Sequence, residues 1–219
     1  MFRMEKTLKA LVFDMDGVLL DSESVCDVIW ERLAAEMGLP NIQAAIAENR
    51  GCNEALMAKN LTDRYGPDFD CPKFFKDFSV HFHKVEFSQG IPLLPHVSET
   101  LEYLKGRGYR LALATSTRRT TATRQLKAVG IFDFFEAWAF GDEIEHSKPA
   151  PDIYLKAARE LGVEPCACAG VEDSPNGIRS VHAAGFKAIM VPDRIEPDDE
   201  MKKLCWKIVK PISMLREFL

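Results

Sequence analysis

The pattern of apolar and polar positions divides the chain into three stretches. Residues 10–13 form a short continuous apolar run, which predicts a buried strand. Residues 22–90 have helical spacing and contain no convincing strand. From Pro95 onward, apolar runs alternate with helical segments. The helices expected in the middle stretch are 22–37, 41–49, 53–65 and 72–86.

The third stretch predicts a parallel sheet with helices on both faces, because continuous apolar runs are typical of strands buried on both sides. Its strands are expected at 110–114, 136–140, 166–171 and 187–191, with an edge strand at 206–209. Its helices are expected at 96–105, from the N-cap Thr117 to Gly130, from Pro151 onward, from Ser174–Pro175 to Gly185, and briefly after Pro211.

The predicted fold class is therefore α/β, with a Rossmann-like doubly wound parallel sheet as its core. Residues 1–21 and 93–219 form this core domain in our prediction. Residues 22–92 form a small all-helical cap domain, inserted after the first strand.

Polar side chains follow several of the predicted strands. Asp14 and Asp16 end the first strand, Thr115 ends the second, and Glu172 and Asp173 end the strand at 166–171. Ligands of doubly wound sheets bind at this edge, beyond the carboxyl ends of the strands. Unpaired carboxylates at the end of a buried strand are costly unless a metal, a cation or solvent compensates them. Our hypothesis is that Asp14 is a nucleophile and Asp16 a proton carrier.

Composition narrows the function classes. The chain has 219 residues, and its net charge of −5 favours neither nucleic acid nor an anionic membrane as a partner. No apolar run reaches the length that a membrane helix needs, and residues 1–6 leave no room for a signal peptide before the first strand. We therefore expect a cytoplasmic protein. Of its six cysteines, only Cys166 and Cys168 are close in sequence, and we expect them as reduced thiols in a buried strand.

Four motifs in order identify a resemblance that covers essentially the whole chain. They are DMDGVLLDS from Asp14, ATST around Thr115, SKPAPDIY around Lys148, and GVEDSPNGI around Glu172. With these motifs the chain resembles the haloacid dehalogenase-like superfamily, and within it the phosphatases and phosphomutases that carry a helical cap after the first motif.

The resemblance implies a magnesium site and an aspartyl-phosphate intermediate. Asp14, Asp173 and the backbone carbonyl of Asp16 would hold Mg²⁺, which prefers oxygen ligands. Glu172 would either bind the metal or hold a metal-bound water, and the sequence leaves both open. A divalent cation would remove the repulsion between a phosphate monoester and the Asp14 carboxylate.

The remaining core roles concern the phosphoryl group and the proton. Asp16 would protonate the leaving alkoxide and then deprotonate the attacking water, a role that a halide leaving group would not require. The Thr115 hydroxyl and the Ser116 backbone N–H would donate to the phosphoryl group, although a helix-capping hydroxyl is the alternative for Thr115. Lys148 would balance the carboxylates and hold the phosphate near Asp14.

The expected cap loop, residues 49–54, carries two candidate substrate contacts. Arg50 is a plausible second anchor for an anionic substrate, and a merely exposed side chain is the alternative. Glu54 stands where β-phosphoglucomutase has an arginine for the distal phosphate of its substrate, and Cys26 stands where that enzyme has a histidine. Both departures weaken the phosphomutase interpretation.

We therefore expect a magnesium-dependent phosphatase of small phosphorylated metabolites, either sugar or polyol phosphates or nucleoside monophosphates. A β-phosphoglucomutase-like phosphomutase is the alternative, and a non-catalytic protein that binds phosphorylated metabolites is a remote one. By resemblance to other enzymes with a single cap, we expect a monomer.

Overall fold

The structure is a computed structural model that describes residues 8–50, 52 and 54–219. The expected N-terminal segment, residues 1–6, lies outside this part of the chain. Two compact units are present: one comprises the chain up to Asp21 together with Pro92–Leu219, and the other is Ser22–Ile91. The insertion thus ends at Ile91, one residue before the expected boundary. Among the described residues, no helix has the length and apolar character needed to cross a bilayer.

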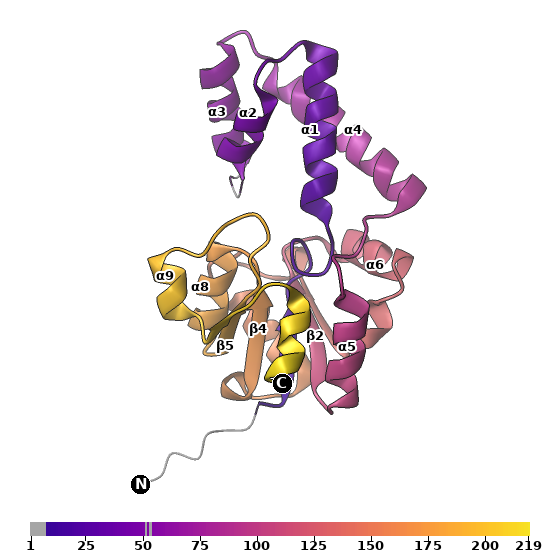
Figure 1. Cartoon of the computed structure of the whole chain (residues 1–219), viewed down its shortest axis with the longest axis vertical. Coiled ribbons are helices and arrows are strands. Elements are labelled where there is room, and N and C mark those ends of the chain that lie inside the picture. Colours follow the sequence, from indigo (N-terminus) through magenta and orange to yellow (C-terminus); the bar gives the residue numbers. More distant parts are fainter. Residues whose placement is uncertain (1–7, 51, 53) are drawn as a thin grey trace. The chain divides into compact units, whose positions relative to one another are not determined.

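The larger unit is built on a parallel sheet (Figure 1). Within the described residues its strands are β1 (Ala10–Phe13), β2 (Arg110–Thr115), β3 (Ala137–Phe140), β4 (Cys168–Glu172), β5 (Lys187–Met190) and β6 (Lys207–Ile208). Their order across the sheet is β3-β2-β1-β4-β5-β6. This order confirms the predicted doubly wound α/β fold, with the last strand at an edge.

The strands are apolar on both sides because helices cover both faces. Alternate side chains of a strand point to opposite faces, so Ala10 and Val12 face one side while Leu11 and Phe13 face the other. The first face packs against α7 (Asp152–Leu161) and α8 (Pro175–Ala183) in one buried cluster. The second face is covered by α5 (Val97–Gly106) and α6 (Arg119–Ala128). The connections through these helices run along the sheet in the direction opposite to those through α7 and α8, and right-handed crossovers in opposite directions place their helices on opposite faces.

The middle of the sheet is a topological switch point. From β1 the chain moves outward to β2 and β3, and it then returns to β4 on the other side of β1. β1 and β4 therefore lie side by side, and Phe13 is paired with Val171. The crevice beyond such a pair is where doubly wound folds bind ligands, and the residues that follow Phe13 and Val171 are Asp14 and Glu172.

Among its described residues, the smaller unit contains helices joined by short loops and no strand. Its helices are α1 (Ser22–Met37), α2 (Ile42–Asn49), α3 (Glu54–Tyr65) and α4 (Cys71–Gln89). Asp70 caps α4 by accepting a hydrogen bond from the Lys73 backbone N–H. The unit has its own apolar core, in which Trp30 of α1 packs edge-to-face on Phe74 of α4.

Two local expectations are wrong. Thr117 does not cap α6, which begins at Arg119 with Arg118 in the N-cap position. Cys166 is exposed in a short 3₁₀ helix, Pro165–Ala167, and only Cys168 belongs to the buried strand. By contrast, Ser174 caps α8 as predicted, since its hydroxyl accepts the Gly177 N–H.

Candidate active site

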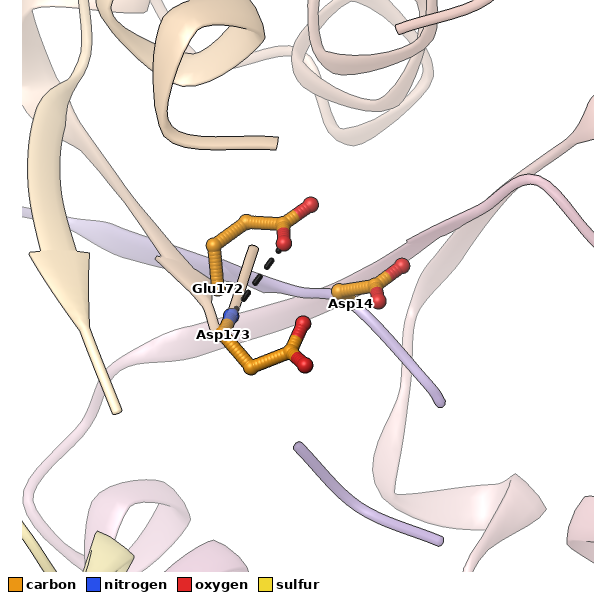
Figure 2. Close-up of side chains that lie close together, drawn as sticks. All are labelled: Asp14, Glu172 and Asp173. Atoms are coloured by element: carbon orange, nitrogen blue, oxygen red, sulfur yellow. Dashed lines mark hydrogen bonds between the residues drawn. The ribbon is translucent and has the colours of Figure 1, made fainter. Parts of the chain in front are cut away.

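Three carboxylates meet where β1 and β4 end. Carboxylate oxygens of Asp14, Glu172 and Asp173 all lie within 4.8 Å of one another. Figure 2 shows the three side chains together, with the Asp173 backbone N–H bonded to the Glu172 carboxylate. The two strand ends are tied by a hydrogen bond of 2.9 Å from the Asp14 N–H to the Val171 carbonyl. Strand pairing at the switch point thus fixes the spacing of the cluster.

Lys148 brings positive charge into this cluster. It comes from the loop before α7, and its ammonium nitrogen lies 2.6 Å from Asp14 Oδ1 and 2.6 Å from Glu172 Oε1. It also donates to the Ala114 carbonyl, at 3.3 Å, at the end of β2. Its side chain is only 9% exposed. Sequence reasoning placed Lys148 near Asp14, and the structure brings the two together.

Glu172 is fully buried, and both of its oxygens accept hydrogen bonds. Oε1 accepts from Lys148 Nζ at 2.6 Å and from the Tyr154 hydroxyl at 2.8 Å. Oε2 accepts from the Asp173 N–H at 3.2 Å and from the N–H and hydroxyl of Ser174 at 3.4 and 3.2 Å. A carboxylate with this many donors has little free capacity for another partner.

The electrostatics of the cluster show an excess of negative charge. Burial raises the pKa of Asp14 to about 7, with nearby Glu172 and Asp16 adding to the effect and Lys148 opposing it. Burial also raises the pKa of Asp173 well above its usual value. The pKa of Lys148 is raised although burial opposes this, because Asp14 and Glu172 favour the charged ammonium. The single positive charge of Lys148 does not offset the negative charge of these carboxylates.

This arrangement fits a divalent cation. The donors are carboxylate oxygens, which are the ligands that magnesium prefers, and their mutual repulsion is the kind that a bound cation relieves. Asp14 and Asp173 are the carboxylates best able to bind it. Glu172 is already occupied by its hydrogen bonds.

A threonine that sequence reasoning assigned to helix capping joins two candidate residues. The Thr117 hydroxyl donates to Asp16 Oδ2 at 3.0 Å, and its backbone N–H donates to Thr115 Oγ1 at 3.0 Å. Thr115 is fully buried, and its hydroxyl oxygen accepts this bond. Ser116, between them, is exposed. The ATST motif contained Thr117, but nothing in the motif identified Asp16 as its partner.

The two cap candidates lie in the smaller unit. Arg50 pairs with Asp27 at 2.9 Å and with Glu23 at 3.5 Å, and 22% of its side chain is exposed. Glu54 is exposed at the start of α3. The loop positions 51 and 53 lie outside the described residues. A cavity of about 320 Å³ inside this unit is lined by Glu23, Cys26, Asp27, Trp30, Ile46, Asn49, Arg50, Cys52, Met57, Phe75 and Phe78.

Comparisons with known proteins agree with this geometry. A family model described as haloacid dehalogenase-like hydrolase matches residues 11–191. The phosphorylated carbohydrates phosphatase of Thermotoga maritima is 30% identical over 191 residues, which cover 83% of this chain and 84% of that protein. The β-phosphoglucomutase of Bacillus subtilis is 28% identical over 190 residues, which cover 84% of this chain and 83% of that one. A haloacid dehalogenase family hydrolase from Deinococcus radiodurans, solved with phosphate and sodium bound, has a TM-score of 0.81 at 25% identity and covers 96% of this chain and 94% of its own. The chain therefore belongs to the haloacid dehalogenase-like hydrolases, in the subgroup of phosphatases that resemble β-phosphoglucomutase.

Proposed function

We propose that this enzyme is a magnesium-dependent phosphatase that hydrolyses small phosphorylated metabolites through an aspartyl-phosphate on Asp14. A phosphoric monoester hydrolase is the enzyme class that the family and its named phosphatases support. The observation that carries the proposal is the meeting of Asp14, Lys148 and Asp173 at the switch point. Sugar or polyol phosphates are the leading substrates, followed by nucleoside monophosphates.

In the first half-reaction, a carboxylate oxygen of Asp14 attacks phosphorus and the bond from phosphorus to the leaving oxygen breaks. Asp16 donates its proton to that oxygen, so the product leaves as an alcohol. In the second, a water gives its proton to Asp16 as it attacks the phosphoryl group, and the bond to Asp14 breaks. Inorganic phosphate is released and both aspartates return to their starting forms.

Two other side chains and one backbone N–H group would hold the phosphoryl group during both steps. The Lys148 ammonium, 2.6 Å from Asp14 Oδ1, is close enough to contact a phosphoryl oxygen bound to that carboxylate. The Thr115 hydroxyl and the Ser116 N–H would add donors from the end of β2. Such donors stabilise charge that develops as the phosphoryl group is transferred.

Asp14, Asp173 and the backbone carbonyl of Asp16 would hold the magnesium ion. When bound, Mg²⁺ supplies positive charge that lets a carboxylate and a phosphate approach each other. Because its oxygens are occupied by five hydrogen bonds, we assign Glu172 to holding Lys148 rather than to direct metal binding.

Hydrolysis is favoured over the phosphomutase alternative by the charges of the smaller unit. A mutase must bind a second phosphate, and Arg50 is the candidate cation for it. Arg50 is already paired with Glu23 and Asp27, so its charge is more than balanced by two carboxylates. Glu54 adds a further negative charge nearby in sequence. A cavity lined by Arg50 together with Glu23 and Asp27 suits a neutral polyol better than a second anion.

Three broader expectations belong to the same proposal. Residues 22–91 act as a cap that excludes water from the reacting phosphate. The enzyme acts as a monomer in the cytoplasm, where its cysteines stay reduced; the described cysteines are all free thiols.

The test is a phosphate-release screen over a broad metabolite library with magnesium, repeated with Asp14→Asn. We expect release from sugar or polyol phosphates, and a loss of at least roughly a thousandfold in Asp14→Asn, because removing a nucleophile leaves only residual catalysis. The matched control is Asp133→Asn, an exposed carboxylate on a short 3₁₀ helix, which should leave activity unchanged.

The screen also separates the alternatives. Isomerised sugar phosphate without released phosphate would overturn the phosphatase proposal in favour of a phosphomutase. Wild-type protein that binds phosphorylated metabolites but turns over no ester, including a generic aryl phosphate, would favour the non-catalytic binding protein.

A further inference from the structure

Tyr154 carries a buried hydroxyl that the mechanism above does not use. It is the third residue of α7, and its side chain is fully buried. Its ring packs edge-to-face on Phe186 at 5.8 Å, a contact that a phenylalanine would make equally well. Burying a hydroxyl is costly unless it is hydrogen-bonded. Packing alone therefore does not explain why this position carries a tyrosine.

The hydroxyl is aimed at the carboxylate that holds Lys148. It donates to Glu172 Oε1 at 2.8 Å, and Lys148 Nζ donates to this same oxygen at 2.6 Å. The Lys148 ammonium also lies 5.4 Å from the centre of the Tyr154 ring, within range of a cation–π contact. Tyr154 thus contacts Lys148 both directly and through their shared acceptor.

We propose that Tyr154 is a positioning residue: by sharing Glu172 Oε1 with Lys148, it keeps the lysine ammonium between Glu172 and Asp14. Only the expected effect of Tyr154 on catalysis rests on the proposed function. The positioning itself is a property of the folded chain.

The balance of contacts around Lys148 explains why the phenol matters. The ammonium lies at 2.6 Å from both Asp14 Oδ1 and Glu172 Oε1, so the two carboxylates compete for it. Donation from Tyr154 satisfies part of the charge on Oε1 and weakens the hold of Glu172 on the lysine. Without it, Oε1 would attract the ammonium more strongly and draw it away from Asp14 and the transferring phosphoryl group.

The spacing of the two residues supports this role. Lys148 and Tyr154 belong to one SKPAPDIY segment, which leads directly into α7. Glu172 comes from β4, and it is tied to the start of α8 through Ser174. The Tyr154–Glu172 bond therefore connects the segment that carries the lysine to the strand that carries the carboxylates.

The test compares Tyr154→Phe with Tyr109→Phe. Both substitutions remove one phenol hydroxyl, but that of Tyr109 donates to the Leu219 carbonyl, away from the cluster. We expect kcat for an aryl phosphate in magnesium to fall about tenfold in Tyr154→Phe, as for loss of a hydrogen bond to a charged group, with KM changed by less than about twofold. Tyr109→Phe should keep wild-type kcat.

The second readout does not depend on turnover. In protein labelled with ¹⁵N-lysine, the side-chain ammonium resonance of Lys148 is assigned by its disappearance in Lys148→Arg. We expect Tyr154→Phe to move this resonance and Tyr109→Phe to leave it in place. An unmoved resonance in folded Tyr154→Phe overturns the proposal, whatever happens to kcat or to the melting temperature. A kcat within twofold of wild type overturns its catalytic consequence.

These outcomes are distinct from failure of the proposed function. If the wild-type protein hydrolyses no phosphate ester, the phosphatase proposal fails while the lysine resonance still tests the role of Tyr154. If the wild type is active and Tyr154→Phe matches it in both readouts, only the positioning proposal fails.

Discussion

At the scale of single residues, the two aspartates of the first motif have different surroundings. Asp14 is buried and contacts Lys148, whereas Asp16 is half-buried and accepts a hydrogen bond from Thr117. The Thr117 hydroxyl fixes the orientation of Asp16, and its N–H fixes that of Thr115. Thr117 thus aligns both Asp16, the candidate proton carrier, and Thr115, whose hydroxyl is a candidate hydrogen-bond donor to the phosphoryl group.

We predict that Thr117→Val impairs proton transfer more than attack on phosphorus. The change removes the hydroxyl at nearly constant volume, so the Asp16 carboxyl loses the hydrogen bond that Thr117 donates to Oδ2. We expect kcat/KM for an alkyl phosphate to fall roughly tenfold, as for a hydrogen bond to a charged group. An aryl phosphate with an acidic leaving group should lose much less, because its leaving oxygen needs little protonation.

Steady-state kinetics with the two esters measure this difference, and Thr120→Val on the exposed side of α6 is the control. An equal loss on both esters would refute a selective effect on the proton carrier.

The role of Thr117 marks the limit of sequence reasoning at this scale. Asp14, Lys148 and Asp173 could be predicted because strand ends and motif order bring such residues to one edge of a sheet. The partner of Thr117 depends on side-chain rotamers and on how β1 and β2 align, which no local pattern encodes. The sequence likewise left two roles open for Glu172, direct metal binding and holding a metal-bound water, whereas its five hydrogen bonds support our proposal that it holds Lys148.

At the scale of elements, the first turn of α8 packs tightly against the buried carboxylate. A Cβ atom added to Gly177 would lie 1.9 Å from Glu172 Cδ and 2.0 Å from its Oε2. The side chain of Glu172 cannot move aside freely, because its hydrogen bonds tie it to Lys148, Tyr154 and Ser174. The glycine is therefore required by the close approach of helix and carboxylate.

We predict that Gly177→Ala destabilises the protein and lowers its activity together. Overpacking a tight site typically costs about 1–3 kcal/mol, and here the clash displaces the residue that holds Lys148. Urea unfolding and phosphate release measure the two effects.

The matched control is Gly106→Ala, at the last position of α5, where an added Cβ meets nothing within 4 Å. This change should be neutral, or stabilising by up to about 1 kcal/mol. Equal stability of the two variants would contradict the proposed close packing.

Most elements could be predicted because their signals are local: apolar runs for strands, and Ser174–Pro175 for the start of α8. The two errors have different causes. Thr117 bonds to Asp16, just beyond the carboxyl ends of the neighbouring strands β2 and β1, instead of capping α6. At Cys166 the chain turns through Pro165–Ala167 before joining β4, so the apolar run overstates the length of the strand.

At the scale of the whole molecule, folding brings together carboxylates that are separate in the unfolded chain. Burial raises the pKa of Asp14 to about 7 and that of Asp173 well above its usual value. Between about pH 4 and 7, the metal-free folded chain therefore holds protons that the unfolded chain has already released. Since the folded state binds more protons in this range, the contribution of these groups to the free energy of unfolding falls as the pH rises. Lys148 does not alter the sign, because its raised pKa affects stability only above its usual value of 10.5.

We predict that magnesium raises the melting temperature more at about pH 8 than at about pH 5. Above about pH 7 the Asp14 carboxyl is mostly ionised in the metal-free protein, where burial and nearby carboxylates disfavour its charge, so a bound cation has most to stabilise. At low pH the ion must displace protons, and its binding weakens. Calorimetric melting in chelator and in excess magnesium, at matched ionic strength, measures the difference.

Asp173→Asn should fold but lose most of the magnesium-induced rise in melting temperature, whereas Asp133→Asn should keep it. A rise that is equal at both pH values, or larger at the lower one, would mean that these carboxylates do not form the metal site.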